Sequence, residues 1–233
     1  MHQRGNDERT TTNDERSTGQ TFIFDLDGVV IDSMPMHTEA WRVYLEGLGI
    51  ECEGIEPRMH GRRNDEIVAD FIAANLTPEE IFAHGAAKEQ LYRCLMKPNL
   101  MAHLVPGIVE FLRSCAGSRV GLASNAEPAN IDFVLDGAGL RQWFQVIVDG
   151  HQVDRPKPFP DIYLRAAHLL GVAPSECIIF EDSPAGVRAA LESGARVVGV
   201  ETHPADLSAV DLVIRDFNDP ALKVWLESVE RRT

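Results

Sequence analysis

The sequence of 233 residues is 44% hydrophobic and 25% charged, which is typical of a globular protein large enough for one domain of about 150 residues and a smaller one. A formal net charge of -14 opposes extended contact with nucleic acid or an anionic membrane, because both need a surface rich in Lys and Arg. No run of about 18 apolar residues predicts a membrane span and no signal-peptide pattern is present, so we expect a cytoplasmic protein, a monomer or weak dimer, that acts on small molecules.

The first 20 residues are almost entirely polar and cannot bury enough apolar surface to offset the entropy of ordering them, which predicts a disordered tail. From Thr21 onward, short β-branched runs alternate with helical patterns. This alternation predicts an α/β fold with a doubly wound, Rossmann-like parallel sheet. The expected strands cover residues 21–27, 119–125, 145–150, 177–182 and 196–201, with a sixth candidate at 211–217.

Helices between the later strands have recognisable ends. Pro106 begins one helix, and a second runs from Pro158 to Leu170. A third runs from Pro184 to Ser193 and stops at Gly194, because glycine readily adopts the left-handed conformation that ends a helix. These helices supply the connections that parallel strands require.

Residues 34–98 show helical periods but no strand. Their apolar stripes comprise Met36, Ala40, Val43 and Leu48 in a first helix and Ile67, Phe71 and Leu76 in a second. A capping box at Thr77–Glu80 begins a third helix, which carries Leu91 and Leu95. The pattern predicts a small α-helical cap domain at 34–98, inserted into a core domain made of 21–33 and 99–233.

Four cysteines are scattered along the chain: Cys52, Cys94, Cys115 and Cys177. None forms a C-x-x-C pair. This spacing favours reduced thiols over disulfides or a zinc site.

Polar side chains gather where the predicted strands end. In an open parallel sheet the carboxyl ends of the strands share one edge, near the point where the strand order reverses, and ligands bind there. Each side chain alone is also explained as a turn former or a helix cap, but their coincidence on four chain segments favours a site. The residues are Asp25 and Asp27, Ser124 and Asn125, Lys157 in the loop after the third strand, and Glu181 and Asp182.

Carboxylates this close repel one another, and a hard cation with oxygen ligands relieves the repulsion, so we infer a Mg²⁺ site. A lysine beside such a site is suited to an anionic ligand, for which phosphate fits. Asp25 and Asp27, two positions apart at a turn, are suited to separate roles, one attacking phosphorus and the other transferring a proton.

The motifs Asp25-Leu26-Asp27-Gly28-Val29, Ser124, Arg155-Pro156-Lys157-Pro158 and Glu181-Asp182-Ser183-Pro184-Ala185-Gly186 together resemble those of the haloacid dehalogenase superfamily, in its capped phosphatase and β-phosphoglucomutase branch. The resemblance implies that Asp25 is the nucleophile of an aspartyl-phosphate mechanism and a metal ligand. It implies that Asp27 is the general acid/base, with its backbone carbonyl on the metal, and that Ser124 and Lys157 hold the phosphoryl oxygens. Asp182 would bind Mg²⁺, with Glu181 orienting a metal-bound water or ligating.

The same resemblance gives expectations for substrate contacts. Gly28 lets the backbone turn close to phosphate, and Asn125 lies beside the phosphoryl site. His37 and Trp41 match positions near the hinge of capped relatives, and Arg62 and Arg63 would face the site from the cap. The alternatives are a packing role for His37 and a solvated surface for the two arginines.

Three functions are considered for this site. The first is a Mg²⁺-dependent phosphatase of a small phosphorylated metabolite, such as a sugar phosphate. The second is a sugar-phosphate mutase, and the third is a catalytically silent binding protein. The candidate residues argue against the third function, because a binding protein needs neither a nucleophile nor an acid/base. Glu127 stands where the mutase has a phosphate-binding lysine, which favours the phosphatase. The cap is less decisive, because His60 and Asn64 stand at two cationic positions of the mutase but Arg62 and Arg63 could substitute from neighbouring positions. Asp27 argues against dehalogenation, because the halide-removing members lack it.

Overall fold

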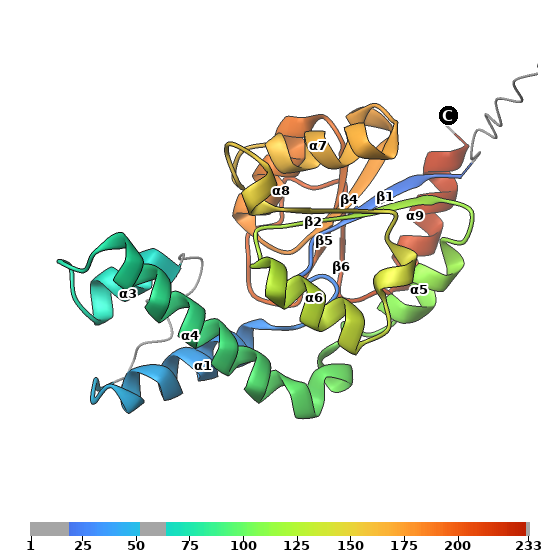
Figure 1. Cartoon of the computed structure of the whole chain (residues 1–233). Coiled ribbons are helices and arrows are strands. Elements are labelled where there is room, and N and C mark those ends of the chain that lie inside the picture. Colours follow the sequence, from blue (N-terminus) through green and yellow to red (C-terminus); the bar gives the residue numbers. More distant parts are fainter. Residues whose placement is uncertain (1–18, 52–63, 232–233) are drawn as a thin grey trace, which may run out of the picture.

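The computed structural model describes residues 19–51 and 64–231, centred on a six-stranded parallel sheet with the order β3-β2-β1-β4-β5-β6 (Figure 1). The strands are β1 (Thr21–Phe24), β2 (Arg119–Ser124), β3 (Val146–Asp149), β4 (Cys177–Glu181), β5 (Arg196–Val200) and β6 (Leu212–Ile214). The predicted parallel sheet is confirmed, including its sixth strand. Each strand is shorter than expected, because the polar residues at its carboxyl end leave the ladder.

Helices cover both faces of the sheet. One face carries α5 (Ile108–Ser114), α6 (Pro128–Gly137) and α9 (Pro220–Glu230), and the other carries α7 (Asp161–Leu170) and α8 (Pro184–Ser193). Successive side chains of β1 point to opposite faces: Phe22 and Phe24 join the first layer, and Ile23 joins the second. Short 3-10 helices complete the core: η2 (Arg141–Trp143), η3 (Gly150–Gln152) and η4 (Pro174–Glu176).

The strand order reverses between β1 and β4. The chain moves outward from β1 through β2 to β3, then returns to the other side of β1 at β4 and moves outward again to β6. Phe24 at the end of β1 is in register with Leu122 of β2 and Phe180 of β4. The residues that follow these strands therefore meet at one crevice, where open α/β sheets bind ligands.

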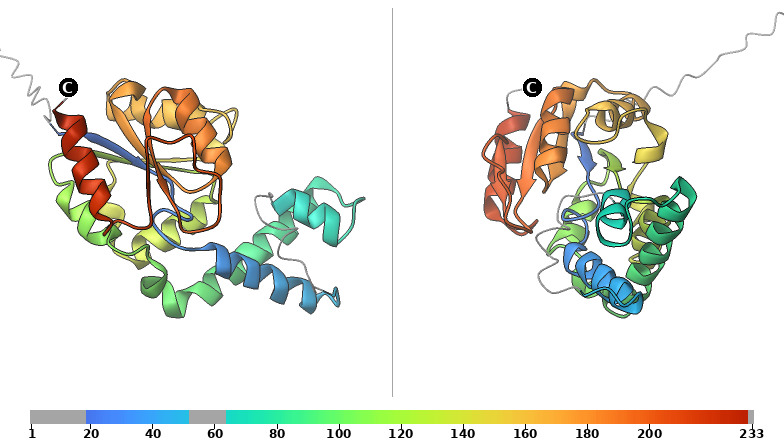
Figure 2. Two further views of the ribbon diagram at one scale, coloured as in Figure 1. Left: turned by 180° about the vertical axis from the view of Figure 1, so that it is seen from behind. Right: turned by 90° about the vertical axis from the view of Figure 1, so that its left-hand side faces the viewer.

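In the described part of the chain between β1 and β2, the cap is formed by α1 (Met34–Gly47), α3 (Asn64–Phe71) and α4 (Pro78–Met96). Figures 1 and 2 show them to one side of the sheet, where the chain leaves β1. Trp41, Leu45, Ile67 and Val68 give the cap a small core of its own. The helix η1 (Lys97–His103) then leads back to the core domain. The helical insertion is confirmed, and its bounds at 34–98 stay a prediction.

Local details of the cap differ from the expected stripes. The buried face of α1 is formed by Ala40, Trp41 and Leu45, whereas Leu48 is 46% exposed. Leu48 follows the end of the helix at Gly47 and so falls outside the helical repeat. The capping box of α4 is confirmed: the Thr77 hydroxyl accepts from the Glu80 amide, and the Glu80 carboxylate accepts from the Thr77 amide.

Some expectations lie outside the described residues: most of the tail, Cys52, His60 and the two arginines at 62 and 63. The other three cysteines, Cys94, Cys115 and Cys177, are free thiols, as expected. Among residues 19–51 and 64–231, no helix is long and apolar enough to cross a membrane.

The core makes a simple stability prediction. Leu122 is fully buried between β1 and the α6 layer, so Leu122→Ala should lower the free energy of unfolding by about 2–5 kcal/mol through lost burial and a residual cavity. Leu164→Ala is the matched control, because Leu164 on α7 is 41% exposed and should cost less than about 1 kcal/mol. Urea denaturation measures both, and equal losses would contradict the described packing.

Candidate active site

Three carboxylates meet at the crevice between β1 and β4. Asp25 follows β1, Glu181 ends β4, and Asp182 is the next residue. One carboxylate oxygen from each lies within 4.8 Å of the others. Asp25 and Glu181 are almost completely buried, with relative exposures of 7% and 0%. The strand ends thus bring together three of the residues expected at this edge.

Lys157 joins two of these carboxylates. Its Nζ donates to Asp25 Oδ1 at 2.7 Å and to Glu181 Oε1 at 2.6 Å. The side chain is only 5% exposed. Burial disfavours the ammonium form, but the two carboxylates outweigh this and raise the pKa of Lys157. Lys157 therefore carries a charge inside the site.

One ammonium does not balance three carboxylates. Burial raises the pKa of Asp25 to about 7, although Lys157 opposes the shift. Burial and the neighbouring Glu181 and Asp25 charges raise the pKa of Asp182 to about 9. The carboxylates thus hold a proton at neutral pH in the absence of a cation. A donor set of buried carboxylate oxygens with a charge deficit fits a hard divalent cation, and Asp25 and Asp182 have oxygens to offer one.

Glu181 is held by five hydrogen bonds. Its Oε1 accepts from Lys157 and from the Tyr163 hydroxyl at 2.7 Å. Its Oε2 accepts from the amides of Asp182 and Ser183 at 2.9 and 3.1 Å, and from Ser183 Oγ at 3.1 Å. Burial would raise the pKa of Glu181, but Lys157 and these donors keep it below its ordinary value. Sequence reasoning missed Tyr163, because its place on the buried face of α7 indicated packing alone.

Two glycines make room for the acidic side chains. Gly28 has φ +78°, and a Cβ there would overlap the Asp182 carboxylate. A Cβ at Gly186 would overlap the Glu181 carboxylate. The backbone at Gly28 does turn tightly, as expected, but the group that approaches it among the described residues is Asp182. Gly186 was part of the motif, yet its spatial role was not evident from the sequence.

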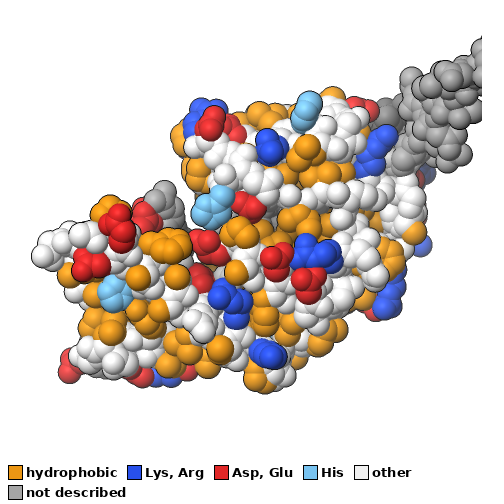
Figure 3. Space-filling view, in the orientation of Figure 1, with side chains coloured by type: hydrophobic (Ala, Val, Ile, Leu, Met, Phe, Trp, Pro, Cys, Tyr) orange, Lys and Arg blue, Asp and Glu red, His pale blue; other side chains and the backbone are white. Residues whose placement is uncertain are grey.

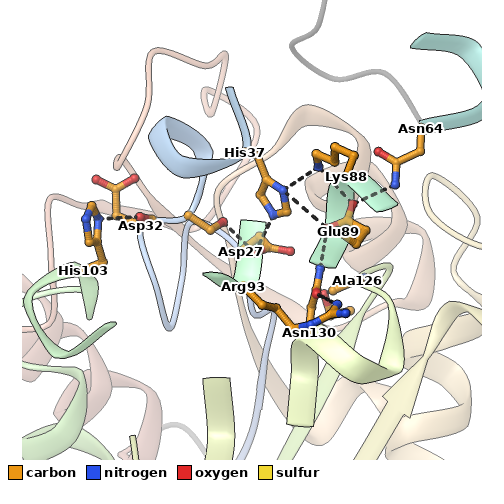
Figure 4. A network of polar contacts seen from close by, with 12 residues as sticks. Asp27, Asp32, His37, Asn64, Lys88, Glu89, Arg93, His103, Ala126 and Asn130 are labelled. Carbon is orange, nitrogen blue, oxygen red and sulfur yellow. Dashed lines mark hydrogen bonds and ion pairs between the residues drawn. The ribbon is translucent and has the colours of Figure 1, made fainter. Parts of the chain in front are cut away.

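Asp27 faces the cap side of the site. Ser33 is the N-cap residue of α1, but its hydroxyl makes no capping bond to the helix. Instead, Ser33 Oγ donates to Asp27 Oδ1 at 2.6 Å. His37 Nε2 lies 3.8 Å from the same oxygen. Burial would raise the pKa of Asp27, but His37 and Ser33 lower it. Asp27 and His37 are thus brought together as a pair (Figure 4).

Lys88 of the cap lies behind His37 and was missed by sequence reasoning. Its Nζ is 2.8 Å from His37 Nδ1, and its side chain is 3% exposed. The His37 ring stacks on Tyr92, with centroids 3.9 Å apart. Trp41 packs inside the cap instead of facing the site. The available signal was the pair Lys88 and Tyr92, which share one face of α4 four residues apart.

Two expected residues, Ser124 and Asn125, lie at the end of β2, and the second of them contacts Lys157. Ser124 is 1% exposed, and its Oγ accepts from the Ala126 amide at 3.2 Å. Asn125 binds the Lys157 backbone reciprocally: its Oδ1 accepts from the Lys157 amide at 3.3 Å and its Nδ2 donates to the Lys157 carbonyl at 3.4 Å. The structure therefore gives Asn125 a contact with the Lys157 loop.

Glu127 lies on the rim of the core. Its carboxylate is 3.2 Å from His151 Nε2, and both side chains are partly exposed. Figure 3 shows acidic side chains and a histidine gathered on this face where the cap meets the core. Glu127 therefore places a carboxylate, paired with His151, at the position where the mutase resemblance implies a lysine.

Comparisons with known proteins agree with this geometry. The family model for haloacid dehalogenase-like hydrolases matches residues 20–194. Hexitol phosphatase A of Escherichia coli is 31% identical, with 84% of this chain and 90% of that protein covered. A fructose-1-phosphate phosphatase of E. coli is 30% identical over 80% and 97% of the two chains.

Solved structures show the same fold. The crystal structure of β-phosphoglucomutase from Clostridium difficile superimposes with a TM-score of 0.77 and 28% identity, and the match covers 90% of this chain and 96% of that one. Its fold is thus shared over both the sheet and the helical insertion. The chain belongs to the haloacid dehalogenase-like hydrolases, in the branch that contains the β-phosphoglucomutases and related capped phosphatases.

Proposed function

We propose that this protein is a Mg²⁺-dependent phosphatase of a sugar or polyol monophosphate that works through an aspartyl-phosphate intermediate. The observation that carries the proposal is the buried Lys157 ammonium shared by Asp25 and Glu181, beside a third carboxylate. An ammonium and carboxylates crowded at a strand edge suit phosphoryl transfer, in which the protein positions the reactants and balances charge. The two phosphatase relatives, named for hexitol and fructose 1-phosphate, support the substrate class.

In the first step, an Asp25 oxygen forms a bond to phosphorus while the ester bond to the substrate oxygen breaks. Asp27 gives its proton to the departing alkoxide. Lys157 and Ser124 hold phosphoryl oxygens. In the second step, a water attacks the phosphorus of the aspartyl phosphate, Asp27 takes the proton of that water, and Asp25 is released with inorganic phosphate.

The lowered pKa of Asp27 fits the second step, because a base must be ionised. For the first step Asp27 must carry a proton, and the negative charge of a bound phosphate raises the pKa of a nearby carboxyl group. The same side chain is therefore suited to both halves of the reaction. Ser33 and His37 hold it toward the cap in this structure.

Asp25 and Asp182, with the Asp27 carbonyl, are proposed to hold Mg²⁺. The bound ion would supply positive charge to the phosphoryl oxygens and favour ionised Asp25. Five hydrogen-bond donors occupy the lone pairs of the Glu181 carboxylate that a cation would need. This supports a role for Glu181 next to the metal site and not as a direct metal ligand. Glu181 then fixes Lys157 and the Asp182 backbone.

Two contacts favour the phosphatase over the mutase. Glu127 places a carboxylate on the rim, where a second phosphate would be repelled. Asn64, at a cationic cap position of the mutase, donates its Nδ2 to Glu89 Oε1 at 2.7 Å. A mutase must hold a bisphosphate while it reorients, whereas a phosphatase needs one phosphate and a water. Arg62 and Arg63 are retained as proposed substrate contacts.

Replacing the nucleophile tests the covalent mechanism. Asp25→Asn keeps the size of the side chain and an acceptor for Lys157 but removes the attacking charge, so kcat should fall at least about 10³-fold. Phosphate release from fructose 1-phosphate measures it. Asp132→Asn is the matched control, because Asp132 is exposed and pairs only with Arg141 among its described contacts; its kcat should stay within about twofold. More than a few percent activity in Asp25→Asn would contradict the mechanism.

Metal binding should be visible in stability. Without a cation, the folded state holds the Asp182 carboxyl with a pKa of about 9 against an ordinary 3.8, so its stability should fall as pH rises between these values. Mg²⁺ replaces that proton. The rise in Tm on adding Mg²⁺ should therefore be larger at pH 8 than at pH 6.

Two variants accompany the melting experiment. Asp182→Asn should lose the Mg²⁺-dependent rise in Tm, whereas Asp132→Asn should keep it. EDTA should abolish phosphate release by the unmodified protein. Phosphate release that EDTA does not change would contradict the Mg²⁺ assignment. The absence of turnover on a broad panel of phosphomonoesters would favour a silent binding protein.

A product assay decides between phosphatase and mutase. We expect net release of inorganic phosphate from sugar or polyol monophosphates and no activation by glucose 1,6-bisphosphate, because the acidic rim disfavours a second phosphate. Phosphate release and glucose 6-phosphate formation from β-glucose 1-phosphate are measured in parallel. Faster formation of glucose 6-phosphate would show that the mutase alternative is correct.

A further inference from the structure

A buried polar cluster lies between the cap helix α4 and the core helix α6, apart from the carboxylates at β1 and β4. We call it the α4–α6 cluster. Figure 4 shows it beside His37. Its members are Asn64 of α3, Lys88, Glu89 and Arg93 of α4, and Asn130 of α6. Lys88, Glu89 and Asn130 are 2%, 6% and 4% exposed, so three polar residues are withdrawn from water together.

Glu89 is the centre of the α4–α6 cluster. Its Oε1 accepts from Asn64 Nδ2 at 2.7 Å and from Lys88 Nζ at 3.0 Å, and its Oε2 accepts from Asn130 Nδ2 at 2.7 Å. Arg93 in turn donates to Asn130 Oδ1 at 2.7 Å, which fixes the direction of that amide. Burial would raise the pKa of Glu89, but Lys88 and the other donors lower it. Glu89 is thus an ionised carboxylate with two oxygens in use.

Glu89 determines the state of Lys88. Burial lowers the pKa of Lys88, and the Glu89 carboxylate opposes this shift without cancelling it. Lys88 Nζ lies 5.3 Å from the centre of the Trp41 ring, so its surroundings offer little solvent. Removing the Glu89 charge would leave a buried ammonium without its adjacent carboxylate, which favours its neutral form or its displacement.

Lys88 in turn determines which His37 nitrogen carries the proton. An ammonium has only donors, so the Nδ1 atom at 2.8 Å from Lys88 Nζ must accept. The proton of a neutral His37 ring then resides on Nε2, the nitrogen that faces Asp27 Oδ1 at 3.8 Å. Stacking on Tyr92 holds the plane of the ring.

We propose that Glu89 is a positioning residue for Asp27. Glu89 acts through Lys88 and His37, and it ties the cap helix α4 to α6 through Asn130. The proposal rests on the proposed function, in which Asp27 transfers the proton. Glu89 touches neither Asp27 nor the carboxylates at β1 and β4. Its Oε2 lies 3.8 Å from His37 Nδ1, whereas Lys88 Nζ lies 2.8 Å from the same nitrogen, within hydrogen-bond distance. Its effect is to keep the Nε2–H group of His37 directed at Asp27 from the cap. Through Asn130, it also holds this part of the cap against α6.

A double-mutant cycle separates positioning from simple stabilisation. Glu89→Gln keeps the shape but removes the charge, and Lys88→Met removes the group through which Glu89 acts. With para-nitrophenyl phosphate as substrate, Glu89→Gln should lower kcat about 10- to 100-fold with KM changed less than about twofold. In the Lys88→Met background the same change should lower kcat much less, because only the longer contact between Glu89 Oε2 and His37 Nδ1, at 3.8 Å, then remains.

Glu79→Gln is the matched control, because Glu79 is exposed in the first turn of the same helix, and it should leave kcat unchanged. Losses of kcat that multiply independently in the double variant would overturn the proposal, as would a Glu89→Gln protein with normal kcat. If Glu89→Gln does not fold, Glu89→Asp replaces it. The shorter carboxylate should give a smaller kcat loss that is again reduced in the Lys88→Met background.

Nuclear magnetic resonance of ring-¹⁵N-labelled histidine tests the relay without turnover. In the wild-type chain the His37 signals, assigned by their loss in His37→Gln, should show the Nε2-protonated tautomer alone. Glu89→Gln and Lys88→Met should both lose this single tautomer, and Glu79→Gln should keep it. An unchanged His37 spectrum in both variants overturns the proposal. A wild-type chain that hydrolyses no phosphomonoester contradicts the proposed function instead, and the His37 spectra still decide the role of Glu89.

Discussion

The crowding of Asp25, Glu181 and Asp182 around a single ammonium is the constraint on which the rest of the site depends. Burying an ion costs several kcal/mol unless partners replace its water. Lys157 replaces part of the lost hydration of Asp25 and Glu181 by donating hydrogen bonds to both carboxylates. The Tyr163 hydroxyl donates a further hydrogen bond to Glu181. Burial and the remaining negative charge favour a bound proton or a cation, which is why the pKa values of Asp25 and Asp182 are raised while that of Glu181 is lowered.

The fold imposes this crowding. Parallel strands end at the same edge, and the reversal of strand order sets β1 next to β4. The backbone must then pass within contact distance of the acidic side chains, which leaves no room for a Cβ at Gly28 or Gly186. Either glycine replaced by alanine would press a methyl group into a carboxylate that the site uses. The site and the sheet topology are therefore parts of one arrangement.

Much of this arrangement was predictable from the sequence. Apolar β-branched runs indicated buried parallel strands, and the polar residues after them indicated one shared edge. Contacts between distant helices were not predictable, because a single sequence shows periodicity and not partners. Tyr163 and Lys88 each occupy the buried face of a helix, where spacing alone indicates packing. Glu89 is adjacent to Lys88 on a helix, and only the approach of Asn130 from α6 reveals that it is buried and bonded.

Asp25 and Asp27 are separated only by Leu26, yet their environments differ in a way that supports separate roles. Asp25 is enclosed by the sheet edge, where burial and the neighbouring carboxylates raise its pKa to about 7 against Lys157. Asp27 faces the cap, where His37 and Ser33 lower its pKa. Two carboxyl groups whose pKa values are pushed apart are the usual basis for dividing nucleophile from acid/base. The core thus controls Asp25, whereas groups that begin or belong to the cap control Asp27. In the proposed mechanism, the position of the cap would therefore act on the proton-transfer group and leave the nucleophile in place.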